Sequence, residues 1–329
     1  MAEPRIDVHF HYLPDFYRSA LIAAGFSHAD GIARLPDWSE RDMIETMDRL
    51  GIERAYLSIS SPGVHFGDDG AARDLARRVN EEAARLKSVH SGRIEFFAST
   101  PLPDIDGAVA EIAHAIDTLG ASGVVFESHF HGIYLGDDRL EPVLAELDRR
   151  RAVLFVHPTT PGISCGCGGG TPDFGYPAPM MEFVFDTTRT FTNMVLSGTF
   201  ERHRELRIIL PHAGAALPIL AGRIDLIGPM LAPEGAAKPP SMREALKCAH
   251  FDLAGTPVPE LLGALLSVAD PNHIHYGSDW PYTPTPVCEK LAAELDGTAL
   301  LDGPLRSQAM RRNSERLFAE RSDTHAPQS

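Results

Sequence analysis

The sequence predicts an α/β fold, a (β/α)8 barrel of the TIM type, and three observations support this fold. Eight short apolar runs rich in β-branched residues alternate with longer segments of helical periodicity. The chain has 329 residues, which suits a single barrel of about 250 residues with insertions. The first run ends in Asp7-Val8-His9-Phe10-His11 instead of a glycine-rich phosphate turn, which disfavours the alternative, an open doubly wound sheet.

Each expected element follows from its own pattern. The eight strands are expected at residues 5–11, 54–60, 93–100, 122–128, 152–158, 207–213, 249–255 and 273–279. Helical segments are expected at residues 38–51, 71–89, 106–120, 140–151, 179–203, 233–249, 259–270 and 303–320. The first of these helices has the clearest ends, because Ser39 suits the N-cap position and Gly51 suits the C-terminal stop.

Two insertions interrupt this alternation, at residues 12–38 after the first strand and 159–179 after the fifth. Both contain glycine and proline and show little periodicity, so we expect long loops on the C-terminal face of the barrel, where active sites form. The second contains Cys165-Gly-Cys167, which we interpret as part of a flexible glycine loop, with a redox or soft-metal role as the minor alternative. One barrel domain is predicted over residues 1–319, followed by a polar tail at 320–329.

Composition argues against several classes of partner and location. The formal net charge of −15 argues against nucleic acid, which needs a basic surface. We find no run of about 18 apolar residues and expect no membrane span, and the N-terminus lacks the apolar core of a signal peptide. Four cysteines are too few for a disulfide framework in a chain of this length, so a reducing cytoplasm is expected.

Five polar side chains stand at or near the ends of apolar runs: His9, His11, His157, His212 and Asp279. The first two are separated by one residue in one strand, so their side chains leave the same face. The strand ends of a barrel meet at one mouth. Three imidazoles and a carboxylate converging there would suit a borderline divalent ion such as Zn²⁺, with an open position for water. Mn²⁺ is the alternative, because these ligand types suit both ions.

Four motifs resemble those of the metal-dependent amidohydrolase superfamily: DVHFH at 7–11, FVHP at 155–158, LPHAG at 210–214 and YGSDWPY at 276–282. They are most similar to the branch of aminocarboxymuconate-semialdehyde decarboxylase, also called amidohydrolase 2. The resemblance covers nearly the whole chain, as far as the segment RRNSERLF at 311–318, which is similar to the terminal helix of the family.

The resemblance implies a role for each of the five side chains. His9, His11, His157 and Asp279 would be the metal ligands, and His212 would be the nearby acid/base residue. Asp279 would also donate the proton of the reaction. The expected fourth strand offers no lysine of the kind that bridges two metals in binuclear members, so one ion is expected.

Two further stretches, at 133–159 and 185–203, look most like the salicylate-type decarboxylases, particularly those of 6-methylsalicylate. An arginine that binds the muconate substrate in relatives is matched here by Glu45, which disfavours that substrate. We therefore expect non-oxidative decarboxylation of a small, salicylate-like aromatic acid, with no organic cofactor. A hydrolase of an amide, ester or lactone would use the same residues to direct water at a carbonyl. A non-catalytic barrel scaffold is the remaining alternative.

Four more side chains are candidates for substrate binding, each with a structural alternative. Arg189 either binds the substrate carboxylate or is an exposed helix residue. Arg223 matches, by the resemblance, an arginine that crosses a dimer interface in relatives to reach the substrate, or else forms a structural ion pair, and a homodimer is expected. His129, with His131, would line the pocket. Trp280 would stack on an aromatic ring or pack its own loop.

Overall fold

The computed structural model describes residues 3–162, 175–235 and 237–322. Eight parallel strands form one sheet in the order β1-β2-β3-β4-β7-β8-β9-β10, which confirms all eight expected strands. They are β1 (Arg5–His11), β2 (Ile52–Ser58), β3 (Ile94–Ala98), β4 (Gly123–Glu127), β7 (Val153–His157), β8 (Arg207–Leu210), β9 (His250–Asp252) and β10 (Ile274–His275). The pair Cys165 and Cys167 lies outside the described residues.

Backbone hydrogen bonds between β1 and the segment that follows β10 close the sheet into a barrel. His11 N donates to Trp280 O at 2.7 Å, and Asp279 N donates to His9 O at 2.8 Å. The predicted (β/α)8 barrel is therefore confirmed. The same hydrogen bonds hold Asp279 directly beside the strand that carries the first two histidines.

A bulge in β1 sets the direction in which two histidines face. Asp7 and Phe10 are three residues apart in β1, whereas their partners in β2, Ala55 and Leu57, are two residues apart. β1 therefore contains one extra residue here. The extra residue changes the alternation of side chains along the strand. As a result His9 lies over the interior ring of Phe155, with ring centroids 4.9 Å apart. His11 lies beside His9 at the same centroid distance of 4.9 Å.

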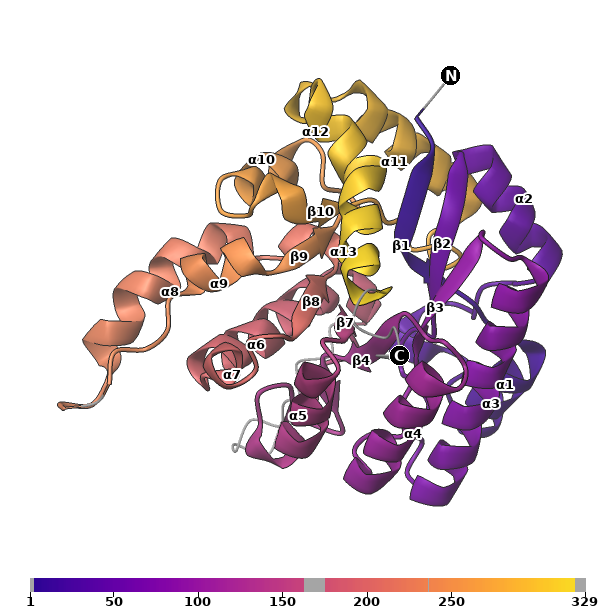
Figure 1. The fold of residues 1–329 in the computed structure, drawn as a ribbon, viewed down its shortest axis with the longest axis horizontal. Coiled ribbons are helices and arrows are strands. Elements are labelled where there is room, and N and C mark those ends of the chain that lie inside the picture. Colours follow the sequence, from indigo (N-terminus) through magenta and orange to yellow (C-terminus); the bar gives the residue numbers. More distant parts are fainter. Residues whose placement is uncertain (1–2, 163–174, 236, 323–329) are drawn as a thin grey trace, which may run out of the picture.

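Helices surround the barrel (Figure 1). They are α1 (Asp15–Ala23), α2 (Glu40–Leu50), α3 (Asp69–Val89), α4 (Ile105–Asp117), α5 (Glu141–Arg149), α6 (Glu182–Leu196), α7 (Thr199–Arg202), α8 (Leu217–Leu231), α9 (Met242–Cys248), α10 (Glu260–Leu266), α11 (Thr285–Gly297), α12 (Pro304–Ser307) and α13 (Asn313–Ser322). The predicted ends of α2 are confirmed. Ser39 Oγ accepts a hydrogen bond from Asp42 N at 3.0 Å, and Gly51 has a φ of 66°.

Several helix predictions were wrong. Both α8 and α11 lie where no helix was expected. In α8 the helical pattern of the sequence is interrupted by Gly222, Gly228 and Pro229. In α11 it is obscured by prolines just before and within the first turn. The first insertion contains α1 instead of being loop throughout. The segment expected at 233–249 is helical only in α9, and the one expected at 179–203 is divided into α6 and α7 at Gly198, whose φ is 74°.

The barrel interior is filled by side chains from successive strands. Ile6 and Val8 of β1 meet Phe97 of β3 and Phe155 of β7 in one buried cluster, and Leu317 of α13 packs into the same cluster. A second, larger layer of apolar side chains lies between the strands and the surrounding helices. The interior is therefore a packed core, and the polar side chains of the mouth stand on top of it.

Candidate metal centre

The ring of His9 is held by a buried carboxylate. His9 Nδ1 donates to Asp252 Oδ2 at 2.8 Å, and both side chains are fully buried. A hydrogen bond to a carboxylate fixes the ring proton on Nδ1 and leaves Nε2 for another partner. That Nε2 atom lies 3.1 Å from His11 Nε2.

The other two imidazoles are oriented in the same way. His11 Nδ1 lies 3.2 Å from the carbonyl oxygen of Ser58 and 3.0 Å from its hydroxyl. His157 Nδ1 donates to Pro158 O at 2.7 Å. In each ring the outer nitrogen is engaged by a protein oxygen, which is the arrangement that metal-binding histidines require. The Nε2 atoms of all three rings are thus presented to one space.

Asp279 completes this set from the segment after β10. Its Oδ1 atom lies 3.4 Å from His9 Nε2 and 3.2 Å from His11 Nε2. One ligand atom from each of His9, His11, His157 and Asp279 lies within 4.8 Å of the others. We call these side chains the four-ligand group. Bonds of about 2.0–2.2 Å to one ion place ligand atoms roughly 3 to 4 Å apart. The separations of 3.1, 3.2 and 3.4 Å among His9, His11 and Asp279 match this, so the group fits a divalent metal ion.

Electrostatics in the four-ligand group are dominated by burial and by the nearby carboxylates. Burial lowers the pKa of His11 and brings the pKa of His157 well below its usual value. Burial opposes the charge on His9 as well, but Asp252 and Asp279 outweigh it and raise the pKa of His9 to about 10. Burial would raise the pKa of Asp279, yet hydrogen bonds from His11 and His9 hold it well below the usual range. The neutral rings of His11 and His157 and the ionised carboxylate of Asp279 are in the forms that bind metal, whereas His9 has to release its Nε2 proton when an ion binds.

His212 lies beside the four-ligand group without belonging to it. Its ring centroid is 5.2 Å from that of His9, and its backbone has a φ of 54° in the short turn after β8. Its Nδ1 atom is buried, with no hydrogen-bond partner among the described residues. Burial, followed by the positive charge of His9, lowers the pKa of His212. A neutral ring with a free nitrogen at this place can exchange a proton with a bound molecule.

Asp252 is a site residue that the sequence reading missed. Its Oδ2 atom accepts from His9 Nδ1, while its Oδ1 atom accepts from His212 N at 3.0 Å and Ala254 N at 2.9 Å. One carboxylate therefore positions both a ring of the four-ligand group and the turn that carries His212. The signal was an aspartate inside the apolar run at 249–255, because a charge buried in a strand needs a partner.

A cavity of about 830 Å³ opens over these side chains. His157, His212 and Asp279 line it, and so do the aromatic rings of Phe183, Trp280 and Tyr282. The Tyr282 ring lies 5.5 Å from that of His11, and the Phe183 ring lies 6.0 Å from that of His157. The cavity therefore has flat apolar walls next to a polar base, which suits a small aromatic ring that carries polar groups.

The predicted substrate-binding residues are only partly gathered here. Trp280 lines the cavity but is 3% exposed and stacks on Phe10, with centroids 4.9 Å apart. Arg189 lies near Glu182 and Asp186, at 3.9 and 3.8 Å, and does not line this cavity.

Two other candidates also lie away from the cavity over the four-ligand group. His129 lines a second cavity, and its Nε2 donates to Thr160 O at 2.9 Å. Arg223 is exposed on α8. Arg49 of α2 does line the cavity, one helical turn after Glu45, and is already paired with Glu289 at 2.8 Å.

Comparisons with known proteins agree with this geometry. A family model described as Amidohydrolase matches residues 6–319. The 6-methylsalicylic acid decarboxylase acuB of Aspergillus aculeatus is 35% identical over 95% of this chain and 96% of its own length. A crystal structure of an amidohydrolase II has a TM-score of 0.89 and 33% identity, covering 96% of this chain and 99% of that chain.

A further solved structure shares the fold at lower identity. It is 5-carboxyvanillate decarboxylase from Novosphingobium aromaticivorans, complexed with manganese and 4-hydroxy-3-methoxy-5-nitrobenzoic acid. Its TM-score is 0.84 at 22% identity, and the match covers 97% of this chain and 96% of that chain.

Proposed function

This chain belongs to the amidohydrolase family, and we propose that it is a metal-dependent, non-oxidative decarboxylase of a small salicylate-like acid. The observation that carries the proposal is the aromatic-walled cavity over the four-ligand group and His212. The 35% identity to a 6-methylsalicylic acid decarboxylase over almost the whole chain favours decarboxylation over hydrolysis.

We propose that the four-ligand group holds one divalent ion. Zn²⁺ suits three imidazoles and a carboxylate, and Mn²⁺ suits them as well; the related carboxyvanillate decarboxylase was solved with manganese. When bound, such an ion withdraws charge from the phenol and carboxylate oxygens of an ortho-hydroxy acid. A lysine between two ions is absent from β4, whose sequence is GVVFE, so a single ion is proposed.

Asp279 is proposed to carry the proton. Its pKa is held well below the usual range, so it is ionised and must first accept a proton. The phenol hydroxyl of the acid supplies one. Asp279 then delivers this proton to the ring carbon that bears the carboxylate, and the electrons of the carbon–carbon bond restore the aromatic ring as CO₂ leaves.

His212 is proposed to act from the other side of the cavity floor. Its neutral ring and unpartnered Nδ1 can receive a hydrogen bond from the acid or hold the oxygen that gains charge. The rings of Phe183 and Tyr282 would hold the substrate ring in place by apolar contact. Trp280, Arg189 and His129 stay predictions as substrate-binding residues.

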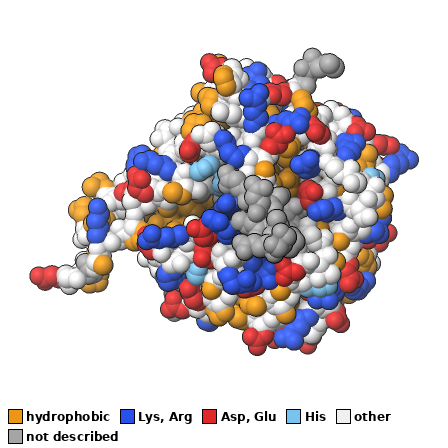
Figure 2. All heavy atoms as spheres, viewed as in Figure 1, with side chains coloured by type: hydrophobic (Ala, Val, Ile, Leu, Met, Phe, Trp, Pro, Cys, Tyr) orange, Lys and Arg blue, Asp and Glu red, His pale blue; other side chains and the backbone are white. Residues whose placement is uncertain are grey.

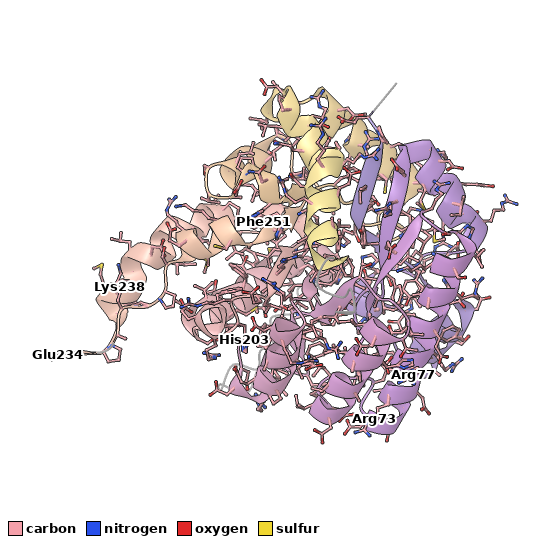
Figure 3. All side chains as sticks on the ribbon, viewed as in Figure 1. Arg73, Arg77, His203, Glu234, Lys238 and Phe251 are labelled. Carbon is pink, nitrogen blue, oxygen red and sulfur yellow. The ribbon has the colours of Figure 1, made fainter. Side chains whose placement is uncertain are left out.

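A homodimer through α8 is proposed as the assembly. Ile219, Leu226 and Met230 share one side of this helix and are 69%, 65% and 69% exposed. The helix extends away from the barrel with α9 toward Glu234 and Lys238 (Figures 1 and 3), and hydrophobic side chains lie along this arm among charged ones (Figure 2). Arg223 lies on the same side, four residues after Ile219. A second copy covering this face would bury the apolar side chains and bring Arg223 toward the partner's cavity.

The apolar character of α8 would also suit a membrane helix. The segment His212–Leu231 is long and apolar enough by composition to cross a membrane, which differs from the expectation of no membrane span. Core helices of soluble proteins can be equally long and apolar, but they are mostly buried, whereas 33% of this segment is buried. We propose a cytoplasmic enzyme whose α8 faces another subunit. Sedimentation should show a dimer that Leu226→Glu dissociates, whereas Val89→Glu, a matched exposed position on α3, leaves it intact.

The reaction is tested with metal-loaded protein and a panel of salicylates, resorcylates, vanillate-type acids and simple lactones. The expected result is CO₂ release from an ortho-hydroxy acid and, in D₂O, one deuterium at the carbon that lost CO₂. Asp279→Asn should retain part of its metal and be close to inactive. Metal-dependent lactone cleavage without CO₂ would establish the hydrolase instead. No turnover of any compound by metal-loaded protein would favour a scaffold.

A further inference from the structure

A second cavity, of about 600 Å³, lies at the same end of the barrel, over the ends of β2, β3 and β4. Its floor includes Ser99, Thr100, Val125 and Glu127. Neither His212 nor any member of the four-ligand group lines it. Asp30 lines both this cavity and the one over the four-ligand group, so the two spaces are neighbours.

The partition between the two cavities is formed by His157 and a chain of hydroxyls. His157 lines the first cavity, while its Nδ1 side faces Glu127 Oε2 of the second at 3.6 Å. Ser61 Oγ donates to Asp30 Oδ1 at 3.0 Å and lies 2.7 Å from Thr159 Oγ1. These hydrogen bonds tie the loops after β1, β2 and β7 together, so the partition is a fixed part of the fold.

Three residues that line the second cavity each have a buried polar atom without a hydrogen-bond partner among the described residues. These atoms are Ser99 Oγ, Thr100 Oγ1 and Glu127 Oε2, and their residues are 4%, 4% and 5% exposed. Buried polar atoms are nearly always satisfied, because an unmade hydrogen bond away from water is costly. Three such atoms around one cavity indicate a bound molecule that supplies the missing partners.

The remaining walls define the chemistry of that molecule. Apolar side chains from several loops and strands line the cavity: Phe26, Val64, Leu102, Val125 and Phe130. Its described lining residues include no lysine or arginine, whereas three acids, Asp30, Glu127 and Glu182, and four histidines, His28, His65, His129 and His131, are present. A carboxylate ligand would therefore find no permanently charged counterion and would meet other acids. The cavity suits a neutral molecule with an apolar body and one or more hydroxyl groups.

We propose that the second cavity binds the neutral hydroxylated arene that decarboxylation leaves behind. This inference rests on the proposed function, because decarboxylation converts an anion into a neutral phenol. The phenol has lost the carboxylate that suits the four-ligand group, but keeps the ring and the hydroxyl that suit Ser99, Thr100 and Glu127. Acid and product thus occupy different cavities on the two sides of His157.

The test is a binding titration of phenol against metal-loaded full-length protein, with and without saturating salicylate. We expect phenol to bind with salicylate present. Thr100→Val keeps the side-chain shape and removes one hydroxyl, so it should weaken phenol binding about 3- to 10-fold without changing KM for the acid. Ser99→Ala should act similarly. Thr187→Val is the matched control, because Thr187 Oγ1 on α6 is equally buried and unpartnered yet lines neither cavity.

Three outcomes would overturn this proposal. Phenol displaced fully by salicylate would place both in the cavity over the four-ligand group. Equal phenol affinity in Thr100→Val, Ser99→Ala and the wild type would show that the unpartnered groups bind something else. Tighter binding of benzylamine than of phenol would identify a cation site built on the acids. Failure of the proposed function is a separate result, because binding is measured without turnover: a protein that binds phenol here but releases no CO₂ would have this site without the proposed reaction.

Discussion

The four-ligand group and a second set of histidines differ in what their ring nitrogens contact. The second set is His250, His273 and His275, which we call the basal cluster because it lies where β9 and β10 begin. There the rings bond to each other and to neutral oxygens. His250 Nδ1 lies 2.9 Å from His275 Nε2, His275 Nδ1 lies 2.9 Å from Ser314 Oγ, and His273 Nδ1 lies 3.0 Å from Lys247 O.

The difference shows that gathered imidazoles alone do not make a metal site. In the basal cluster no carboxylate accepts these hydrogen bonds. Burial, followed by the neighbouring rings of His275 and His273 and then by Arg207 and Arg316, lowers the pKa of His250. The four-ligand group, by contrast, has two carboxylates: Asp252 accepts from His9 Nδ1, and Asp279 shares one space with ligand atoms of all three rings. Orientation and a carboxylate separate a ligand set from a structural network.

The largest effect is expected from removing the His212 side chain beside the four-ligand group, and it should appear in turnover. His212→Ala should keep the bound metal and lose about 10²–10⁴-fold in turnover, since a positioned acid/base group contributes that much. Metal content by mass spectrometry, together with initial rates of CO₂ release, checks both parts. If this variant loses its metal, His212 is a ligand and the four-ligand group is incompletely described. His250→Ala in the basal cluster should change neither quantity directly.

Removing the carboxylate that orients His9 should have the next largest effect. Asp252→Asn keeps the shape but removes the charge and leaves one acceptor oxygen for the three donors His9 Nδ1, His212 N and Ala254 N. Metal affinity should therefore fall about 10- to 100-fold. Competition with a chelator measures the affinity. Asp186→Asn is the control, because Asp186 is an equally buried aspartate, on α6, that accepts from Tyr134 OH at 2.5 Å. Equal losses in the two variants would contradict a specific role for Asp252.

The smallest effect concerns the basal cluster and acid stability. Burial lowers the pKa of His275 to about 3, whereas an unfolded histidine titrates near ~6.5. Between these values the unfolded chain binds the proton and the folded chain does not, so the free energy of unfolding falls as the pH drops below about 6.5. At pH 5 the loss from His275 should be about 2 kcal/mol.

Denaturant unfolding at several pH values tests this expectation. His275→Gln should flatten the dependence of the free energy of unfolding on pH between about 6.5 and 4, while the bound metal stays at wild-type level. An unchanged slope in this variant would show that the titration lies elsewhere. Together with the variants of His212 and Asp252, this measurement tests whether one histidine set controls turnover and the other controls stability.

Much of the fold was predictable from the alternation of apolar runs and helical segments, because strand and helix periodicities are strong local signals. The helix α8 was not, since its glycines and proline weaken those signals. Spacing placed His9 and His11 on one face, but only the bulge after Asp7 decides that this face is the barrel interior. A bulge depends on the pairing of β1 with β2, which no single segment specifies.

The same limit applies to the site. Strand-end positions identified His157 and Asp279, because parallel strands deliver their ends to one mouth. The contacts of Asp252 with His9 and with the backbone of His212 join three distant segments, so no local pattern contains them. Arg189 and His129 have the right chemistry for substrate binding but lie outside the cavity over the four-ligand group, because the direction of a helix or loop side chain depends on packing.

The double contact of Asp252 has a consequence for descendants of this chain. A lineage that no longer needed its reaction would be free to change this one residue, and both the ring of His9 and the turn of His212 would lose their support together. Every histidine and aspartate that a motif search recognises would still be present. Such a descendant would be classified as an enzyme by its motifs. Position 252 should therefore be inspected before an activity is assigned to a relative from its motifs alone.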